Sequence, residues 1–280
     1  MNYRHAYHAG NFADVVKHAL LVRILVHLCS KPAAFRVIDT HAGAGLYDLG
    51  SPEATRSSEW QGGIGRLVGA RLDEALGSLL APYLNVVTGY NSAGRLRTYP
   101  GSPAIVRAFL RTQDRCLACE IEPNAAAALK RSLGHDRRVK MVAIDGWTAL
   151  NAYVPPPERR GLVLIDPPYE DAGDFLNQGL DEARRKWASG IYLLWYPIKG
   201  REQPDALARR LRRSGINKIL RAELNLRAAE AGHLTGCGLI TVNPPWRLEQ
   251  ELKILLPGLA EILAGAGGGG ARIDWIAGEM

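Results

Sequence analysis

The chain has 280 residues, 47% of them hydrophobic and 22% charged, which fits one large α/β domain or a domain with an insertion and excludes a wholly disordered chain. Lysine and arginine outnumber aspartate and glutamate by 35 to 28, and this basic surplus favours a polyanionic partner such as nucleic acid, although a generic enzyme can carry the same charge. The four cysteines show no metal-ligand pattern and are interpreted as buried thiols, and no segment resembles a signal peptide or membrane span, so we expect a cytoplasmic protein with no metal and no membrane partner.

The first predicted element is a helix over residues 11–29. Asn11 can cap its start, Asp14 three residues later completes a weak capping box, and Pro32 ends the element. Four apolar residues fall on one face of this helix, namely Val15, Ala19, Val22 and Val26. The pattern predicts a helix packed on one side against a core.

A short apolar strand over 35–39 follows and runs into a loop of small residues over 40–45. Glycines there let the backbone approach a ligand closely, where a Cβ atom would collide. The spacing of Asp39, Gly43 and Gly45 resembles the first motif of class I methyltransferases, with His41 in place of its usual first glycine. Small-residue turns after strands are common, so this motif alone is a weak indication.

Residues 46–98 interrupt the pattern, because they are rich in glycine, serine, arginine and glutamate and contain two helical stretches near 59–69 and 71–84. The next good strand lies only at 115–120. We therefore predict a core formed by 1–45 and 99–280, with a small helical insertion subdomain at 46–98.

Beyond residue 115, apolar strands alternate with helices. Helices are predicted at 123–133, 175–188 and 204–214, and strands at 139–144, 161–165, 191–195, 219–226, 238–242 and 272–276. The glycine run at 267–270 is expected to be a loop. This alternation predicts an α/β fold with a doubly wound, mostly parallel sheet.

Four strand ends of this sheet are acidic: Asp39, Glu120, Asp145 and Asp166. Ligands of such sheets bind beyond the carboxyl ends of the strands. Glu120 can accept hydrogen bonds from ribose hydroxyls, or it can be a solvated carboxylate. Asp145 with Gly146 can contact a cofactor adenine, or it can be a plain turn.

The sequence Asp-Pro-Pro-Tyr at 166–169 is the strongest signal, because two prolines directly after an apolar strand are costly without a purpose. The amine of adenine is a poor nucleophile, since its lone pair is delocalised into the ring. The Asp166 carboxylate and a carbonyl near Pro167 can hold its two N–H bonds and accept the departing proton. Tyr169 offers a ring on which an extruded base can stack. The alternative is a strand-to-loop turn with an incidental aromatic residue.

A second turn of this type, Asn-Pro-Pro-Trp at 243–246, also follows an apolar strand. It lies much later in the chain than the strand expected to carry the catalytic motif. We therefore interpret the turn at Asn243 as structural.

Six segments together closely resemble the RlmJ family, whose members are bacterial 23S ribosomal RNA adenine-N6 methyltransferases. They are Tyr-Arg-His-Ala-x-His-Ala-Gly-Asn-x-Ala-Asp-Val-x-Lys-His at 3–18, Asp-Thr-His-Ala-Gly-Ala-Gly at 39–45, Tyr-Pro-Gly-Ser-Pro at 99–103, Gly-Leu-x-Leu-Ile-Asp-Pro-Pro-Tyr-Glu at 161–170, Gly-Ile-Tyr-x-Leu-Trp-Tyr-Pro at 190–197 and Asn-Pro-Pro-Trp at 243–246. The resemblance covers nearly the whole chain. It implies a class I, Rossmann-like core that uses S-adenosylmethionine and acts on 23S ribosomal RNA. We also expect a monomer.

The resemblance also implies a role for each matching residue. Cofactor contacts would come from Lys17, His18, His41, Gly43, Ser102, Glu120, Asp145, Gly146 and Asp166. Asp166 would also accept the proton, with Pro167 and Tyr169 beside it in the catalytic turn. Tyr3 and His5 on the N-terminal tail would approach the adenine together with Tyr169. Glu122 can replace Glu120 in the ribose role, but Glu120 follows the strand directly and is preferred.

Three alternatives remain open at this point. A DNA adenine-N6 methyltransferase needs a DNA-reading domain, and none is evident. A protein glutamine-N5 methyltransferase favours Asn as the first residue of the turn. A non-catalytic ribosome-assembly RNA binder could keep the fold.

Clustered basic residues offer sites for the phosphate backbone of RNA, or they are simply solvated faces. They lie on two predicted helices and in the insertion: Arg184, Arg185, Lys186, Arg209, Arg210, Arg212, Arg213, Arg56, Arg66, Arg71, Arg95 and Arg97.

Overall fold

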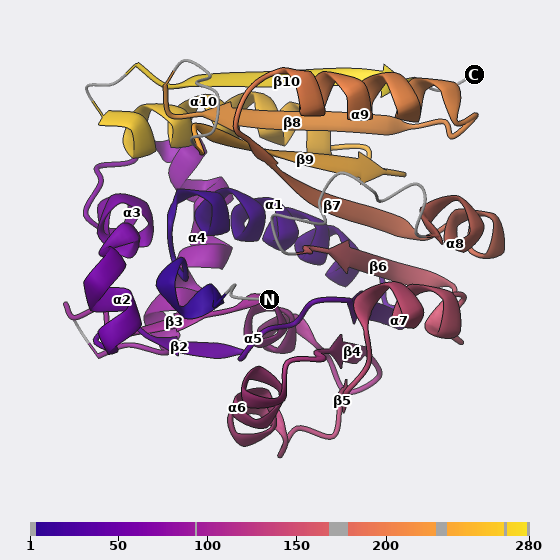
Figure 1. Ribbon diagram of the computed structural model, residues 1–280, viewed down its shortest axis with the longest axis horizontal. Helices are drawn as coiled ribbons and strands as arrows, with labels where there is room; N and C mark the ends of the chain where they lie inside the picture. Colours follow the sequence, from indigo (N-terminus) through magenta and orange to yellow (C-terminus); the bar gives the residue numbers. More distant parts are fainter. Residues whose placement is uncertain (1–3, 93, 168–178, 228–233, 266–267, 279–280) are drawn as a thin grey trace.

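The computed structural model describes residues 4–92, 94–167, 179–227, 234–265 and 268–278, and its centre is an eight-stranded sheet (Figure 1). The strands are β1 (Phe35–Asp39), β4 (Arg115–Cys119), β5 (Val139–Val142), β6 (Arg160–Ile165), β7 (Ile191–Ile198), β8 (Ile219–Asn225), β9 (Gly236–Val242) and β10 (Gly270–Ala277). Their order is β10-β8-β9-β7-β6-β1-β4-β5. From β5 to β7 every pair is parallel, whereas β9 is antiparallel to β7 and β8, and β10 is antiparallel to β8. The mostly parallel sheet is therefore confirmed, with two strands reversed near one edge.

Helices cover both faces of the sheet, as a doubly wound fold requires. One face packs against α1 (Phe12–Cys29), α5 (Ser102–Phe109), α6 (Pro123–Leu133) and α10 (Leu248–Ala264), and the other against α7 (Gly146–Tyr153), α8 (Asp181–Lys186) and α9 (Glu202–Arg213). Alternate residues of each strand serve the two cores: in β6, Leu162 and Leu164 face the first and Val163 and Ile165 the second. The first core includes α1, which lies behind the sheet in Figure 1.

The α1 helix is buried on all sides rather than on one face. Residues outside the face that was predicted to be buried, such as Leu20, Leu21 and Ile24, are as inaccessible to solvent as Val15 and Val22. The helix is enclosed by the sheet, α5, α10 and the insertion. A helix that is apolar all round is expected in such a position.

The segment 46–98, which was predicted to be an insertion, is mainly helical, but it begins and ends with strands. It contains α2 (Pro52–Ser57), a π-helical turn η2 (Gln61–Gly65), α3 (Arg66–Val68) and α4 (Glu74–Gly89). Its ends, β2 (Leu46–Asp48) and β3 (Thr98–Pro100), pair antiparallel. Leu80, Tyr83 and Val87 of α4 are buried in the first core against α1 and α10. The segment therefore shares a core with the rest of the chain.

Several predicted bounds differ from the structure. The strands predicted to end at residues 120 and 144 end at Cys119 and Val142, and β7 continues to Ile198. Only α8 represents the predicted helix 175–188, whose first residues lie outside the described ranges. Gly270 of the predicted glycine loop already belongs to β10.

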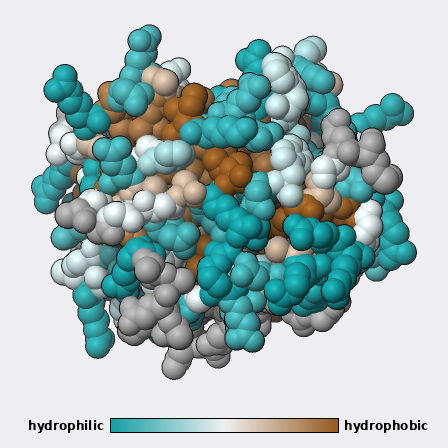
Figure 2. Space-filling model, turned by 90° about the horizontal axis from the view of Figure 1, so that it is seen from above, coloured by the Kyte–Doolittle hydropathy of each residue, from teal (hydrophilic) through white to brown (hydrophobic). Residues whose placement is uncertain are grey.

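The face shown in Figure 2 is largely hydrophilic, with apolar side chains exposed in several patches. Cys116, Cys119 and Cys237 are buried free thiols, as predicted, whereas Cys29 is only partly buried. Among the helices of the described residues, none is long and apolar enough to cross a membrane.

Candidate active site

The carboxyl ends of β1, β4 and β6 border a cavity of about 820 Å³, within the size range of small-molecule sites. Eight of the residues predicted to form the site line it: His5, Lys17, His18, His41, Gly43, Ser102, Glu120 and Asp166. They come from the N-terminal tail, α1, three strand ends and the start of α5. Lys17 and Asp166, which are 149 positions apart in the chain, thus share one wall of this cavity.

Glu120 ties the first loop to the end of β4. Its Oε2 accepts a hydrogen bond from the Gly43 amide at 2.8 Å, and its Oε1 accepts one from the Glu122 amide at 2.7 Å. Gly43 has φ +62°, and a Cβ atom there would lie 2.2 Å from the Tyr47 hydroxyl, so the loop requires glycine. Glu122 instead caps α6 by accepting bonds from two backbone amides of its first turn. Of the two carboxylates, Glu120 is the one that shapes the loop beside the cavity.

Asp39 supports the wall of the cavity from behind. Its side chain is fully buried, and its Oδ2 accepts a hydrogen bond from the Ser102 hydroxyl at 2.6 Å. Its Oδ1 has no hydrogen-bond partner among the described residues. Burial raises the pKa of the Asp39 carboxyl to about 7, although the bond from Ser102 acts in the opposite direction. Asp39 therefore holds Ser102, which lines the cavity, at the start of α5.

His18 lies in the same wall as a neutral group. Its Nδ1 is 2.7 Å from the Tyr99 hydroxyl, which is 2.9 Å from the Tyr83 hydroxyl. Burial, reinforced by the charge of Lys17, lowers the pKa of the His18 imidazole to about 3. Its buried Nε2 has no hydrogen-bond partner in the part of the chain that the structure describes. A polar ligand in the cavity can supply one.

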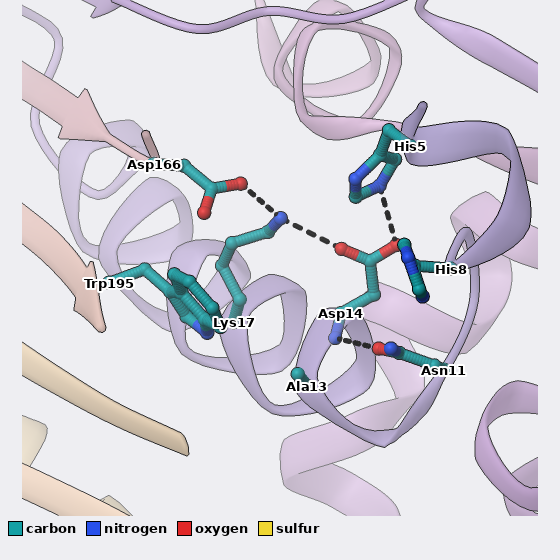
Figure 3. A pocket seen from close by; sticks show the side chains of 8 residues that line it. All are labelled: His5, His8, Asn11, Ala13, Asp14, Lys17, Asp166 and Trp195. Carbon is teal, nitrogen blue, oxygen red and sulfur yellow. Dashed lines mark hydrogen bonds and ion pairs between the residues drawn. The ribbon is translucent and has the colours of Figure 1, made fainter. Parts of the chain in front are cut away.

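Lys17 is a buried cation between two carboxylates (Figure 3). Its ammonium donates to Asp14 Oδ1 at 2.7 Å and forms a short ion pair with Asp166 Oδ2. The side chains of Lys17, Asp14 and Asp166 are 5%, 3% and 15% exposed. Burial by itself lowers the pKa of Lys17, but the two carboxylates outweigh it and hold this pKa well above the usual value. For Asp14, burial by itself raises the pKa, but Lys17 and His5 outweigh it and hold this pKa well below the usual value. Lys17 and Asp14 are therefore both charged.

The N-terminal tail is fastened to this group at two points. His5 Nε2 lies 3.0 Å from Asp14 Oδ2, and the Gly10 amide donates to the same oxygen at 2.9 Å. Farther out, His8 and Asn11 both contact the carboxylate of Glu59 in the insertion, at 2.9 Å. A cavity of about 20 Å³, room for about one water molecule, lies between these tail residues, Lys17 and Asp166.

Three of the predicted residues lie beside the cavity rather than in its lining. Asp145 caps α7 by accepting bonds from the Thr148 amide and hydroxyl. Gly146 packs behind the first loop, where a Cβ atom would lie 2.5 Å from the Thr40 carbonyl oxygen and 2.6 Å from the His41 ring. Pro167 is buried directly after Asp166. Tyr3, Pro168 and Tyr169 lie outside the described residues.

The second Pro-Pro turn lies at the opposite end of the strands from Asp166, where the parallel strands begin. Because β9 runs antiparallel to β7, its last residue, Val242, pairs with Tyr192 at the start of β7. Asn243, at φ +52°, donates to the carbonyl oxygens of Ala188 and Gly190 at 2.7 and 2.8 Å. This geometry supports the interpretation of Asn243 as structural.

The basic residues of α8 and α9 also lie toward the end of the sheet where the parallel strands begin. Arg184, Arg185 and Lys186 end α8 shortly before β7 begins, and Arg210, Arg212 and Arg213 end α9 shortly before β8 begins. Since β7 and β8 run in the same direction as β6, their starts are far from Asp166. These residues are therefore poorly placed to hold RNA at the mouth of the cavity.

Sequence reasoning assigned no site role to Asp14, Glu59 or Tyr47. Asp14 was considered only as part of a helix cap, and Asn11 does accept the Asp14 amide at 3.0 Å. A signal was available, because Asp14 and Lys17 are opposite charges three positions apart in an apolar helix. Glu59 and Tyr47 belong to the insertion, and only the folded chain brings them to the tail.

Comparisons with known proteins find relatives that match nearly the whole chain. The family model described as "Ribosomal RNA large subunit methyltransferase D, RlmJ" matches residues 32–277. Proteins called "Ribosomal RNA large subunit methyltransferase J" from Escherichia coli (strain K12) and Haemophilus influenzae (strain ATCC 51907 / DSM 11121 / KW20 / Rd) are 42% and 39% identical, with each pair of chains aligned over its full length. A crystal structure of a Legionella pneumophila protein is 34% identical, with a TM-score of 0.86 and 96% and 98% of the two chains covered.

Proposed function

The chain belongs to the RlmJ family of ribosomal RNA large-subunit methyltransferases, and we propose that it transfers a methyl group from S-adenosylmethionine to the N6 amine of an adenine in 23S ribosomal RNA. The observation that carries this proposal is the Asp166 carboxylate. It lies at the carboxyl end of the central strand β6, held by Lys17 and facing the large cavity.

The residues around the cavity fit S-adenosylmethionine. Glu120 is placed to accept hydrogen bonds from the ribose hydroxyls, because each carboxylate oxygen can accept more than the one backbone bond that it has. The loop at Gly43 allows close approach of the backbone, and Ser102, His18 and His41 offer polar groups along the same wall. Bound there, the cofactor supplies a methyl group made electrophilic by the positive sulfonium. Asp145 and Gly146 stay proposed contacts to its adenine, behind the first loop.

Asp166 acts on the substrate amine. Lys17 holds its Oδ2, and the second oxygen can accept an N–H of the adenine amine and take its proton. The carbonyl near Pro167 can hold the other N–H. The Tyr169 ring can stack on the base, and Tyr3 and His5 of the tail can contact it as well. Catalysis is then mainly alignment of nitrogen, methyl carbon and sulfur.

The alternatives differ in what they methylate or in whether they methylate at all. A glutamine methyltransferase would favour Asn in the catalytic turn, and Asn243 lies at the opposite end of the strands from Asp166. A non-catalytic RNA binder would not need a carboxylate held by a buried lysine. We further propose that the reaction needs no metal, since sulfonium chemistry requires no metal ion, and that the protein is a cytoplasmic monomer.

The test is an identification of the product. The purified protein is incubated with methyl-labelled S-adenosylmethionine and, in parallel, unmodified 23S ribosomal RNA, adenine-containing DNA or a glutamine peptide. Label in N6-methyladenosine from the RNA alone is expected. Label in DNA or peptide only, or no transfer despite cofactor binding, would point to one of the alternatives.

A further inference from the structure

Asp14 connects the N-terminal tail to the ion pair of Lys17 and Asp166 (Figure 3). Its Oδ1 accepts from the ammonium of Lys17, and its Oδ2 accepts from the Gly10 amide and faces His5. Lys17 continues to Asp166. A continuous chain of ionisable side chains therefore runs from the N-terminal tail to the carboxylate that faces the substrate.

The positions of these groups depend on one another because they are buried. A cation as inaccessible as Lys17 must be compensated by nearby negative charge, and the two carboxylates do this from opposite sides. Without the charge of Asp14, Lys17 would turn to Asp166 alone. The tail would lose the acceptor that receives the Gly10 amide and His5 at the same time.

We infer that Asp14 is a positioning residue, which docks the substrate-contacting tail and aligns the Asp166 carboxylate through Lys17 as one unit. This inference rests on the proposed function. It assigns Asp14 an effect on the chemical step, although Asp14 does not line the large cavity and is not placed to touch the adenine or the cofactor.

Glu59, in the segment 46–98, offers a matched control because it contacts the same tail. Glu59 receives His8 and Asn11 with bonds of similar length, but its partners do not include Lys17. Both carboxylates fasten the tail, and only Asp14 also holds the lysine. A role in fastening the tail therefore predicts equal effects of the two substitutions, and a role in alignment predicts different effects.

The experiment compares Asp14→Asn with Glu59→Gln in steady-state methylation of 23S ribosomal RNA. An amide has one oxygen, so the side chain introduced by Asp14→Asn cannot accept from Lys17 on one side and from Gly10 on the other. We expect kcat to fall about tenfold or more in Asp14→Asn, with KM for RNA changed less, and Glu59→Gln to change mainly KM. The loss caused by His5→Ala should also shrink in the Asp14→Asn background, because the two residues act through one contact.

Equal losses in the two variants, or additive losses with His5→Ala, would overturn the inference. Thermal melting checks that each variant is folded. If Asp14→Asn does not fold, Asp14→Glu keeps the charge beside Lys17 but displaces it by one methylene, and its kcat should fall while its melting temperature stays close to that of the wild type. A wild-type kcat in the folded variant would also overturn the inference. Wild-type protein that methylates no adenine in the same assay would instead defeat the proposed function.

Discussion

Asp39 is a buried carboxyl of the site, and its burial outweighs the effect of the nearby Lys17 charge on its pKa. It keeps one hydrogen bond from Ser102, and burial raises its pKa to about 7. The unfolded chain restores a value near 3.8. Between these two values the folded chain binds more protons than the unfolded chain, so the contribution of Asp39 to stability falls as the pH rises from about 4 to about 7.

Asp39→Asn should therefore stabilise the protein relative to the wild type as the pH rises. The amide keeps an acceptor for Ser102 but has no charge to bury, so the difference in unfolding free energy should shift in favour of the variant between about pH 4 and pH 7. Urea denaturation at several pH values measures it.

Asp114→Asn is the control, because it should change the unfolding free energy in the opposite direction. Asp114 is also inaccessible, but Arg111 and the Phe35 amide hold its pKa below the usual value despite its burial. Its loss should destabilise the protein throughout this pH range. If the difference in unfolding free energy between Asp39→Asn and wild type stayed constant over this pH range, Asp39 would not change its protonation within it.

The residues of the site could be predicted only where a motif or a strand end marked them. Asp166, Glu120 and His41 follow apolar strands, and Lys17 entered through the family resemblance. The link between Lys17 and Asp166 could not be predicted, because it depends on how α1 packs against β6 across 149 positions of sequence.

Gly63 allows the backbone of segment 46–98 to pack closely against the start of α1. A Cβ atom at Gly63 would lie 2.1 Å from the Gly10 carbonyl oxygen and 2.5 Å from the carbonyl carbon of Asn11, whereas Gly62 has nothing within 4 Å. The Ile64 amide also donates to the Gly10 carbonyl at 2.8 Å. The tail, the cap of α1 and the π-helical turn thus meet at one point.

Gly63→Ala should destabilise the protein by about 2 kcal/mol or more, because backbone must move to admit the methyl group. Gly62→Ala, one position away in the same element, should change stability by less than about 1 kcal/mol. Chemical denaturation compares the two. Similar small effects in both would show that the contact at Gly63 can relax without cost.

Most strands and several helices with clear apolar patterns were predicted, whereas elements that depend on distant pairing were not. The β1 strand and α6 have the predicted bounds. No helix was predicted for α5, α7 or α10, and α5 has a proline in its first turn and α10 has Pro257 inside it. The three-residue strands β2 and β3 were missed because they pair across the whole insertion.

In the whole molecule, the two Pro-Pro turns lie at opposite ends of the strands of the central sheet. The regular alternation of strands and helices predicted the parallel part. It could not predict the reversal of β9, because the direction of a strand depends on its connection and not on its residues. That reversal is what places Asn243 away from Asp166.

Asn243→Ala should lower stability by about 1–3 kcal/mol and leave the methylation rate within about twofold of wild type. It removes the donor for the Ala188 and Gly190 carbonyl groups and puts a side chain that disfavours positive φ at that position. Thermal melting and the RNA assay, run on the same preparation, measure both effects. A loss of more than about a hundredfold in rate by a folded variant would place this turn in the active site.

The most direct test of the account is the single-turnover rate of Asp166→Asn on unmodified 23S ribosomal RNA, measured with cofactor affinity on the same sample. The amide keeps the shape of the side chain but cannot take the proton. The rate of N6-methyladenosine formation should fall about 100-fold to 10,000-fold, with the fold intact and the cofactor still bound. A rate equal to that of wild type would contradict the central role of this carboxylate.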